Sequence, residues 1–429
     1  MAASNPPVLV QLASYNTALQ GLQGLPQDLV DWLSPTFEVS NFLARERRAP
    51  DIVVVGFQEL LPLHLGLAGL SKSVIENRNE LILSQIEAHT PNKERYSLVA
   101  KIVNVGVALL VYAKDEGFAS RVRDVQTRWT GSGPAYMGNK GAVGVRFRVE
   151  GDNHSLGEVY TFVCAHLTAH EPKLARRIAD YHHIVGSLLF DSLPGTSSTG
   201  PTTIYSTSHL FFLGDLNFRV SLPPTHPLAQ VSSTANISST LSTQAGRDEL
   251  KEYDQLFIER NKGTVFHGLR EGDFWTFKCT YKYLMGRVDD YDPKRVPSWT
   301  DRILYTTHTD SPDTPDKSSI TNVLYTSIPS YSTSDHKPIV SLLLVPTQSS
   351  SSDNGAIPVL RLPSTYLPTP DPLAAVKRYT GRSLDRIVGI VWWLLSVLGA
   401  GNAAIGVGNF LLGVGAWVWW PRKSPSTDV

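Results

Sequence analysis

The stretch HLFFLGDLNFRV, from His209 to Val220, places chemically capable side chains directly after an apolar run. The run from His209 to Leu213 predicts a buried strand, and Asp215 and Asn217 follow it two positions apart. Residues spaced by two point the same way from an extended backbone. The carboxylate can hold a metal or polarise a water, and the amide can donate to an anionic oxygen. A plain strand-ending turn is the alternative, since Gly, Asp and Asn are common turn residues.

Other polar side chains recur at expected strand ends or in short motifs. They are Asn16, Glu59, His166 with His170, Asp301 in PSWTDRIL, and Asp335 with His336 in SDHKPIV. Each has an ordinary structural explanation by itself. Glu59 can cap a turn, and Asp301 can pair with its neighbour Arg302. The repetition of polar strand ends along the chain favours one shared site over unrelated turns.

The residue types indicate metal-assisted hydrolysis of a phosphoester. Glu59 is a hard oxygen ligand suited to Mg²⁺, and no Cys/His spacing indicates zinc. Asp215 is expected to activate or orient the attacking water. His336 is expected to donate to phosphoryl oxygens once a carboxylate such as Asp301 orients it.

The motifs resemble the inositol polyphosphate 5-phosphatases of the endonuclease/exonuclease/phosphatase superfamily, to which DNase I is related. The resemblance spans residues 14–345 and rests on SYN, GFQE, NKGAVGVR, CAHLTAH, GDLNFR, TYKY, PSWTDRIL and SDHKP. It implies an α/β fold: a four-layer sandwich of two mixed β-sheets flanked by helices, of the DNase I type. In the family pattern, Lys294 stands one residue after the usual lysine position, which Pro293 occupies here, and Leu284 replaces a usual acidic residue.

The resemblance also implies a role for each site residue. Glu59 and Asn16 are expected at Mg²⁺, with Asp335 supporting the metal shell. Catalytic roles fall to Asp215 on the nucleophilic water, Asn217 and His166 at the scissile phosphate, and His336 paired with Asp301. Contacts to the neighbouring 4-phosphate fall to Tyr281, Lys282 and Arg295, and Lys140 is expected to be a further phosphate contact.

Alternating strands and helices are expected to position these residues. The apolar runs predict strands over 8–14, 52–55, 160–164 and 209–213, and the periodicity predicts helices within 25–46 and over 71–89, 172–189 and 247–260. Residues 191–208 and 223–246 are expected to be polar loops. The stretch LPLHLGLAGL, over 61–70, is either a helix packed on the core or a segment that dips into a bilayer.

Composition restricts the possible partners and compartment. The 429 residues contain 39 Lys+Arg and 39 Asp+Glu, so any attraction for phosphate must be local. This balance argues against a nucleic acid partner, because duplex binding normally needs a basic face. The 2 cysteines cannot form a disulfide framework and fit a reducing compartment. The N-terminus has no signal-peptide pattern.

The C-terminal part predicts a membrane anchor. Residues 1–346 are expected to form the catalytic domain, 347–376 a Ser/Pro-rich linker, and 377–429 the anchor with basic flanks. Residues 387–420 contain no charged side chain, and as one helix they would extend about 50 Å against a hydrocarbon thickness of about 30 Å. The pattern fits two topologies: one span with an interfacial extension, or a hairpin. The basic residues before the segment favour a cytosolic catalytic side.

The tail narrows the expected function within the family. A catalytic domain, a linker and a hydrophobic tail resemble the tail-anchored fungal members at the endoplasmic reticulum. The expected reaction is Mg²⁺-dependent hydrolysis of the 5-phosphate of phosphatidylinositol 4,5-bisphosphate to phosphatidylinositol 4-phosphate at a membrane. The alternatives are a nuclease or other phosphodiesterase of the same superfamily, and an inactive phosphoinositide-binding tether. The sequence identifies no protein partner.

Overall fold

The computed structural model describes residues 6–22, 48–90, 92–151, 156–192, 200–230, 234–347, 357–399, 408 and 411–412. The strands are β1 (Val8–Asn16), β2 (Ile52–Gln58), β3 (Tyr96–Asn104), β4 (Val107–Lys114), β5 (Val122–Gly131), β6 (Gly141–Val149), β7 (Glu158–His166), β8 (His209–Asp215), β9 (Arg270–Glu271), β10 (Asp301–Thr307), β11 (Thr321–Ser327) and β12 (Ile339–Val345). The α-helices are α2 (Leu63–Ala68), α3 (Lys72–His89), α4 (Leu174–Ser187), α5 (Pro227–Gln230), α6 (Thr234–Ser242), α7 (Gln244–Leu250), α8 (Gln255–Asn261) and α9 (Ala374–Val397). Short 3₁₀ turns are η3 (Ala119–Arg121), η4 (Pro134–Tyr136), η6 (Glu171–Lys173), η7 (Lys251–Tyr253) and η8 (Phe274–Thr276).

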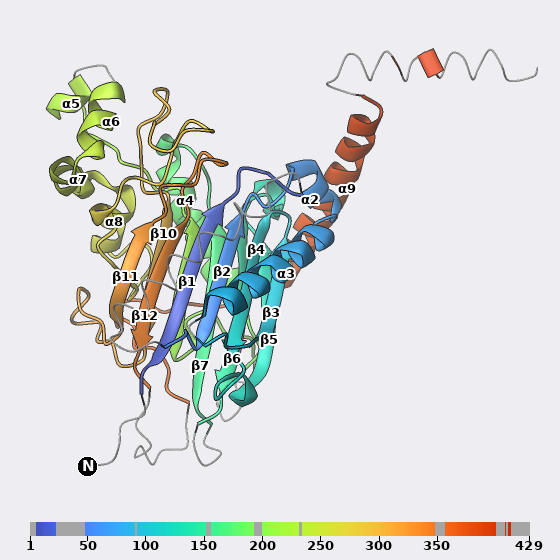
Figure 1. Ribbon diagram of the computed structural model, residues 1–429, viewed down its shortest axis with the longest axis vertical. Coiled ribbons are helices and arrows are strands. Elements are labelled where there is room, and N and C mark those ends of the chain that lie inside the picture. Colours follow the sequence, from blue (N-terminus) through green and yellow to red (C-terminus); the bar gives the residue numbers. More distant parts are fainter. Residues whose placement is uncertain are drawn as a thin grey trace, which may run out of the picture.

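Two mixed sheets of 6 strands each form the centre of the fold (Figure 1). One has the order β11-β12-β1-β2-β4-β3, and the other has the order β5-β6-β7-β8-β10-β9. Each contains one central parallel pair, β1 with β2 and β7 with β8, between antiparallel neighbours. The expected mixed sheets with flanking helices are confirmed.

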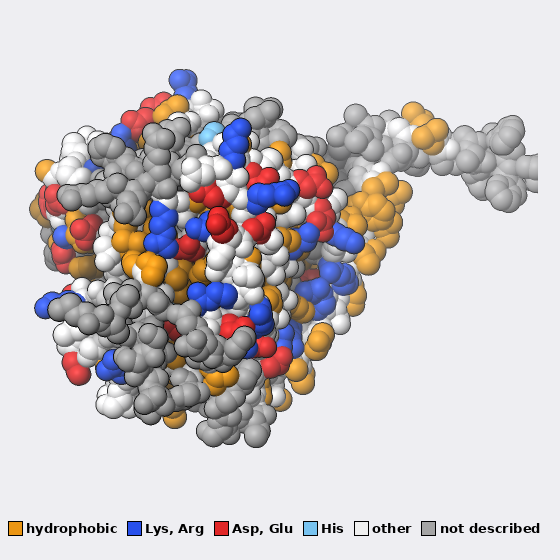
Figure 2. All heavy atoms as spheres, turned by 60° about the horizontal axis from the view of Figure 1, so that its bottom comes forward, with side chains coloured by type: hydrophobic (Ala, Val, Ile, Leu, Met, Phe, Trp, Pro, Cys, Tyr) orange, Lys and Arg blue, Asp and Glu red, His pale blue; other side chains and the backbone are white. Residues whose placement is uncertain are grey.

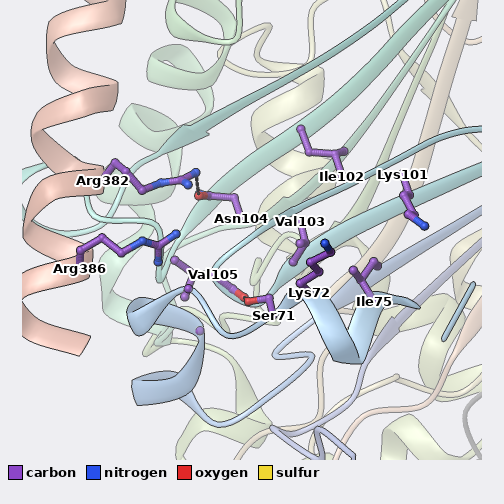
Figure 3. Close-up of a pocket in the computed structure, with 12 residues that line it drawn as sticks. Ser71, Lys72, Ile75, Lys101, Ile102, Val103, Asn104, Val105, Arg382 and Arg386 are labelled. Atoms are coloured by element: carbon purple, nitrogen blue, oxygen red, sulfur yellow. Dashed lines mark hydrogen bonds between the residues drawn. The ribbon is translucent and has the colours of Figure 1, made fainter. Parts of the chain in front are cut away.

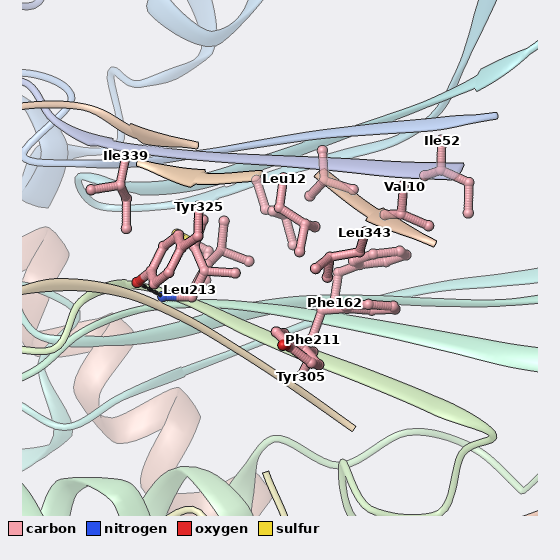
Figure 4. Packing of buried hydrophobic residues seen from close by; sticks show 14 of the residues in the cluster. Val10, Leu12, Ile52, Phe162, Phe211, Leu213, Tyr305, Tyr325, Ile339 and Leu343 are labelled. Atoms are coloured by element: carbon pink, nitrogen blue, oxygen red, sulfur yellow. Dashed lines mark hydrogen bonds between the residues drawn. The ribbon is translucent and has the colours of Figure 1, made fainter. Parts of the chain in front are cut away.

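Alternating side chains of both sheets fill the space between them (Figure 4). Val10, Leu12 and Ile52 of one sheet face Phe162 and Phe211 of the other, and all are fully buried. The outer face of the first sheet packs on α3, whose buried residues recur at helical spacing. The outer face of the second sheet packs on α4. Burial on both faces explains why these strands have almost continuous apolar sequences.

The expected single helix over 247–260 is wrong, because the segment divides into α7, η7 and α8. Asp254 causes the break: it has an extended backbone, and its side chain accepts the N–H of Phe257 as the N-cap of α8. The polar insertion at 223–246 contains α5 and α6 instead of being a plain loop. The helices expected within 25–46 lie outside the described residues.

The C-terminal segment packs on the body of the protein over much of its described length. Within the expected linker, Ile357 and Leu360 are buried, and the Leu360 N–H donates to Thr207 O at 2.9 Å. Helix α9 then joins the expected basic flank to the first part of the expected membrane segment. Among the described residues, no helix combines the length and the apolar character needed to span a bilayer. Most of residues 400–420 lie outside that part of the chain.

Candidate active site

Four of the predicted site residues come together at the carboxyl ends of the two parallel strand pairs. Asn16 ends β1, Glu59 follows β2, and His166 and Asp215 end β7 and β8 in register with each other. Parallel strands end at the same edge of a sheet, and the face-to-face packing of the sheets brings the two edges together. This edge is the upper one in Figure 1.

The Asp215 carboxylate lies at the centre of the group. Its Oδ2 accepts a hydrogen bond from Asn16 Nδ2 at 3.0 Å and lies 3.3 Å from His166 Nε2 and 3.9 Å from His336 Nε2. Burial alone would raise the pKa of Asp215, but the charges of His336 and His166 outweigh it and hold this pKa well below its usual range. Asp215 is therefore an anion at neutral pH.

His336 is held by Asp301, which begins β10. Their Nδ1 and Oδ2 atoms are 2.9 Å apart, and the hydroxyls of Thr280 and Thr300 donate to the same oxygen at 2.7 and 2.9 Å. Burial would lower the pKa of His336, but Asp301 and Asp215 raise it to about 9. The imidazolium therefore persists at neutral pH, with Nε2 turned toward Asp215.

The alternative pairing of Asp301 with Arg302 is wrong. Arg302 points the opposite way from Asp301 along the strand, as alternation requires. Its guanidinium binds Asp254 Oδ1 at 2.8 Å and Glu271 Oε1 at 2.6 Å, and all three side chains are almost inaccessible to solvent.

Lys140 contributes a buried cation next to His166. Its Nζ contacts both ring nitrogens of His166. Burial lowers the pKa of Lys140, while Asp215 and Glu59 act in the opposite direction. Phosphate oxygens entering here would meet the lysine and the histidine together.

The Glu59 carboxylate has the character of a ligand for a divalent cation. Glu59 Oε1 is 3.9 Å from His166 Nε2, the side chain is 34% exposed, and no hydrogen-bond donor to it is found among the described residues. Glu59 adopts a φ of 50°, a strained conformation that turns it out of the strand direction. Asn16 Oδ1 accepts the Ala18 N–H at 3.1 Å and keeps a second lone pair. These oxygen donors fit Mg²⁺.

The Asp335 carboxylate, expected to support the metal shell, faces a lysine. Its Oδ2 lies 3.6 Å from Lys282 Nζ, which is also 3.7 Å from Asp292 Oδ2. The Asp335 carbonyl accepts the Tyr283 N–H at 3.0 Å. Asp335 therefore contacts the segment that carries Tyr281 and Lys282, and among the described residues no contact joins it to Glu59 or Asn16.

Asn217 contacts Arg219, a residue of the site that was not predicted from the sequence. Asn217 has a φ of 58°, and its Nδ2 donates to Leu167 O at 3.1 Å. Its Oδ1 accepts from the guanidinium of Arg219, whose Cζ lies 4.4 Å from the centre of the Tyr281 ring. The arginine in GDLNFRV could have indicated this role, because it follows a strand that is expected to be buried and a buried cation needs a partner.

The remaining predicted substrate residues lie around this arginine. The Tyr281 ring is 4.6 Å from the His336 ring. Arg295 and Lys294 are exposed, and neither side chain contacts a described partner. His170 is also exposed; burial and the charges of Lys173 and Arg295 lower its pKa, so it lies at the rim near these cations.

Comparison with known proteins identifies the class. The family model described as Endonuclease/Exonuclease/phosphatase family 2 matches residues 13–342. The chain therefore belongs to this family.

The curated relatives are phosphatases of inositol phosphates and phosphoinositides. The chain is 32% identical over 322 residues to mouse type II inositol 1,4,5-trisphosphate 5-phosphatase, which covers 73% of this chain and 28% of the relative. It is 32% identical over 287 residues to polyphosphatidylinositol phosphatase INP53 of Saccharomyces cerevisiae, covering 65% of this chain and 22% of that protein. The chain thus spans well under a third of these relatives and is homologous to inositol polyphosphate 5-phosphatases, which are phosphoric monoester hydrolases.

Solved structures agree on the fold. The inositol polyphosphate 5-phosphatase domain of SpSynaptojanin, in complex with inositol (1,4)-bisphosphate and calcium ion, is 27% identical with a TM-score of 0.56, covering 79% of this chain and 84% of that one. Cimex nitrophorin, 18% identical with a TM-score of 0.52, covers 79% of this chain and 98% of its own. The second likeness shows the fold alone.

Proposed function

We propose that this chain is an Mg²⁺-dependent phosphoinositide 5-phosphatase that converts phosphatidylinositol 4,5-bisphosphate to phosphatidylinositol 4-phosphate and phosphate. One observation carries the proposal. An anionic Asp215 lies between the Asn16 amide and the His336 imidazolium, and the Glu59 carboxylate lies beside them, 3.9 Å from His166 Nε2. The relatives named as 5-phosphatases and the neighbour bound to an inositol bisphosphate support the substrate class.

In this proposal the protein orients groups and stabilises charge more than it transfers protons. The low pKa of Asp215 makes it a weak base, so its carboxylate orients the attacking water. Phosphoryl transfer through a loose transition state needs little base assistance. The His336 N–H and the Lys140 ammonium stabilise the charge on the phosphoryl oxygens. Glu59 and Asn16 would hold Mg²⁺, which neutralises charge on the phosphate when bound.

A second group of side chains, three cations and one tyrosine, is proposed to bind the neighbouring 4-phosphate. It consists of Tyr281, Lys282 and Arg295, to which the structure adds Arg219. Arg219 fixes the Tyr281 ring from one side while His336 packs near it. The phenol thereby lies between the proposed 5-phosphate and 4-phosphate positions.

We also propose that the chain acts at the endoplasmic reticulum membrane, anchored through residues 387–420, with a catalytic domain of residues 1–346 in the cytosol. The exposed apolar side chains of the second half of α9 support the anchoring. Figure 2 shows hydrophobic side chains gathered where α9 leaves the body.

The decisive experiment measures phosphate release by the full chain in detergent micelles across a panel of phosphoinositides, with and without Mg²⁺. Release from the 4,5-bisphosphate only with Mg²⁺ is expected. Asp215→Asn, which keeps the side-chain shape, should lower kcat by at least about 10²-fold. Nicking of a plasmid without phosphate release would favour the nuclease alternative. Lipid binding without turnover would favour the tether.

A further inference from the structure

A basic pocket whose lining includes none of the predicted site residues lies between α9 and the opposite wall formed by α2, α3 and β3 (Figure 3). It is a cavity of about 290 Å³. Four cationic side chains line it: Lys72, Lys101, Arg382 and Arg386. No carboxylate is among the described lining residues.

The nearby acids leave this positive charge largely unbalanced. Glu76 pairs with Lys101. Asp385 of α9 is fully buried, accepts the Gly138 N–H at 3.0 Å and offsets part of the charge of Arg382 and Arg386. Four cations thus face two acids. Lys72 is exposed and forms no ion pair with a described residue. The pocket therefore keeps a net positive charge.

Arg382 keeps an unused donor in this pocket. Its Nη2 donates to Asn104 Oδ1 at 3.0 Å, and its Cζ lies 3.8 Å from the centre of the Trp129 ring. Its Nε is buried without a hydrogen-bond partner among the described residues. Burial and the charge of Arg386 lower the pKa of Arg382, and the charge of Asp385 only partly opposes them. An anion in the cavity would relieve this repulsion.

The backbone makes room for the second arginine. Arg386 Nη1 donates to Leu67 O at 2.7 Å, which directs its guanidinium to the turn after α2. Gly69 in that turn has a φ of 90°, and a Cβ there would lie 2.5 Å from Arg386 Cζ. The left-handed turn therefore favours glycine, and the missing side chain leaves room for the guanidinium.

The surface next to the pocket is apolar. Directly after Arg386, the exposed side chains of α9 become hydrophobic: Ile387 is 61% exposed, Val391 52% and Leu395 49%, all at a spacing of four on one face. The chain then continues without charge to Trp420. A phosphate-sized cationic pocket next to an apolar helix face matches the two ends of an acidic phospholipid.

We propose that this pocket binds the headgroup phosphate of an acidic phospholipid whose acyl chains lie along the second half of α9, separately from the catalytic site. The proposal rests on the membrane association proposed above but not on the reaction. Arginine and lysine donors would supply charge-assisted hydrogen bonds to the phosphate oxygens.

The test compares partitioning of the full chain onto phosphatidylcholine vesicles with and without phosphatidic acid, which is not the proposed substrate. Phosphatidic acid should strengthen partitioning of the wild type. In Lys72→Gln/Lys101→Gln that gain should fall roughly fivefold for each lysine neutralised. The matched control is Lys251→Gln/Lys262→Gln, which removes the same charge near α8 on the opposite side of the molecule (Figure 1). An equal loss in the control, or an unchanged gain in the pocket variant, would overturn the proposal.

Two further measurements identify the source of the phosphate and separate this proposal from the reaction. Inorganic phosphate at constant ionic strength should not reproduce the binding; saturable phosphate binding without a vesicle gain would overturn the lipid assignment. The pocket variant should keep wild-type kcat on a soluble short-chain substrate, and a loss there would contradict a separate site. If the wild type releases no phosphate at all, the proposed reaction fails while the partitioning result stands.

Discussion

At the scale of single residues, the catalytic centre holds a carboxylate and an imidazolium in opposite charge states. Asp215 and His336 each stabilise the charge of the other, although both side chains are buried. Asp301 adds a second carboxylate on the far side of the imidazole ring. The site therefore contains an imidazolium N–H at neutral pH, which in the proposed reaction donates to a phosphate.

This arrangement predicts how kcat depends on pH in the alkaline range. With a pKa of about 9, His336 should keep kcat level to roughly pH 8, and kcat should fall as the pH rises through 9. Because this pKa is above that of a free histidine, its contribution to stability is complete below about pH 6.5 and is lost over the same alkaline range. The measurement is kcat against pH, with Tm recorded at each point.

The matched variant for this prediction is Asp301→Asn, which removes the first carboxylate that raises the pKa of His336. The fall in kcat should begin at a lower pH. An alkaline limb at the same pH in both proteins would show that another group controls it.

Residue types were predictable at the site, and so was the pairing of His336 with Asp301, but the other side-chain contacts were not. Asn16, Glu59, His166 and Asp215 could be found because each follows an apolar strand. The contact of Asp335 with Lys282, and the placement of Arg219 on Tyr281, depend on side chains from distant loops. Neither periodicity nor spacing encodes such contacts.

At the scale of elements, a buried network of ion pairs holds β10 against its neighbours. Arg302 binds Asp254, the cap of α8, and Glu271 of β9, and its Cζ lies 3.8 Å from the centre of the Phe274 ring. This network lies on the strand that begins with Asp301, so it also holds the partner of His336 in place.

Arg302→Met should lower the free energy of unfolding by about 3–5 kcal/mol, because it leaves the buried carboxylate of Asp254 without its cation and that of Glu271 with Arg260 alone. Urea unfolding measures the change. Arg123→Met, which removes a half-exposed arginine, is the control and should change stability by less than about 1 kcal/mol. A similar small change in both variants would contradict the prediction.

Helix α9 was predictable as apolar at its end but not as a packed part of the body. Two glycines allow the close contact. A Cβ at Gly381 would lie 1.9 Å from Tyr136 O, and one at Gly389 would lie 2.2 Å from Ala68 N. A basic flank before an apolar run normally indicates exposure, and the sequence gives no sign that these glycines meet a partner. Local turn chemistry at Asp254 likewise overrode a continuous helical pattern.

Gly381→Ala should loosen α9 although alanine favours helix formation. Amide hydrogen exchange over residues 374–397 should become faster, because the added methyl group clashes with backbone that cannot move aside. Ser383→Ala, at an exposed position of the same helix, is the control and should leave exchange unchanged. Slower exchange in Gly381→Ala would show that helix propensity outweighs packing.

At the scale of the whole molecule, the catalytic edge and the apolar half of α9 lie at the same end of the fold (Figure 1). Helix α2 connects them: it starts four residues after Glu59, and its His64 ring lies 5.7 Å from that of Trp392. A membrane bound by α9 would therefore lie next to the catalytic residues.

Val391→Asp tests this arrangement by placing a charge on the exposed apolar face. Activity on substrate in vesicles should fall by about tenfold or more, because burying a carboxylate in a membrane costs about 2.5–3.5 kcal/mol. Activity on a soluble short-chain substrate should not change. Equal losses on both substrates would indicate damage to the fold instead.

The division of the catalytic residues between the two sheets has a consequence for assembly. One sheet supplies Asn16 and Glu59, and the other supplies His166, Asp215 and Asp301. A folding intermediate with only one sheet in place would hold half of the reactive groups and remain inert. Turnover in a refolding experiment would thus report the moment at which the two halves dock, and no earlier event.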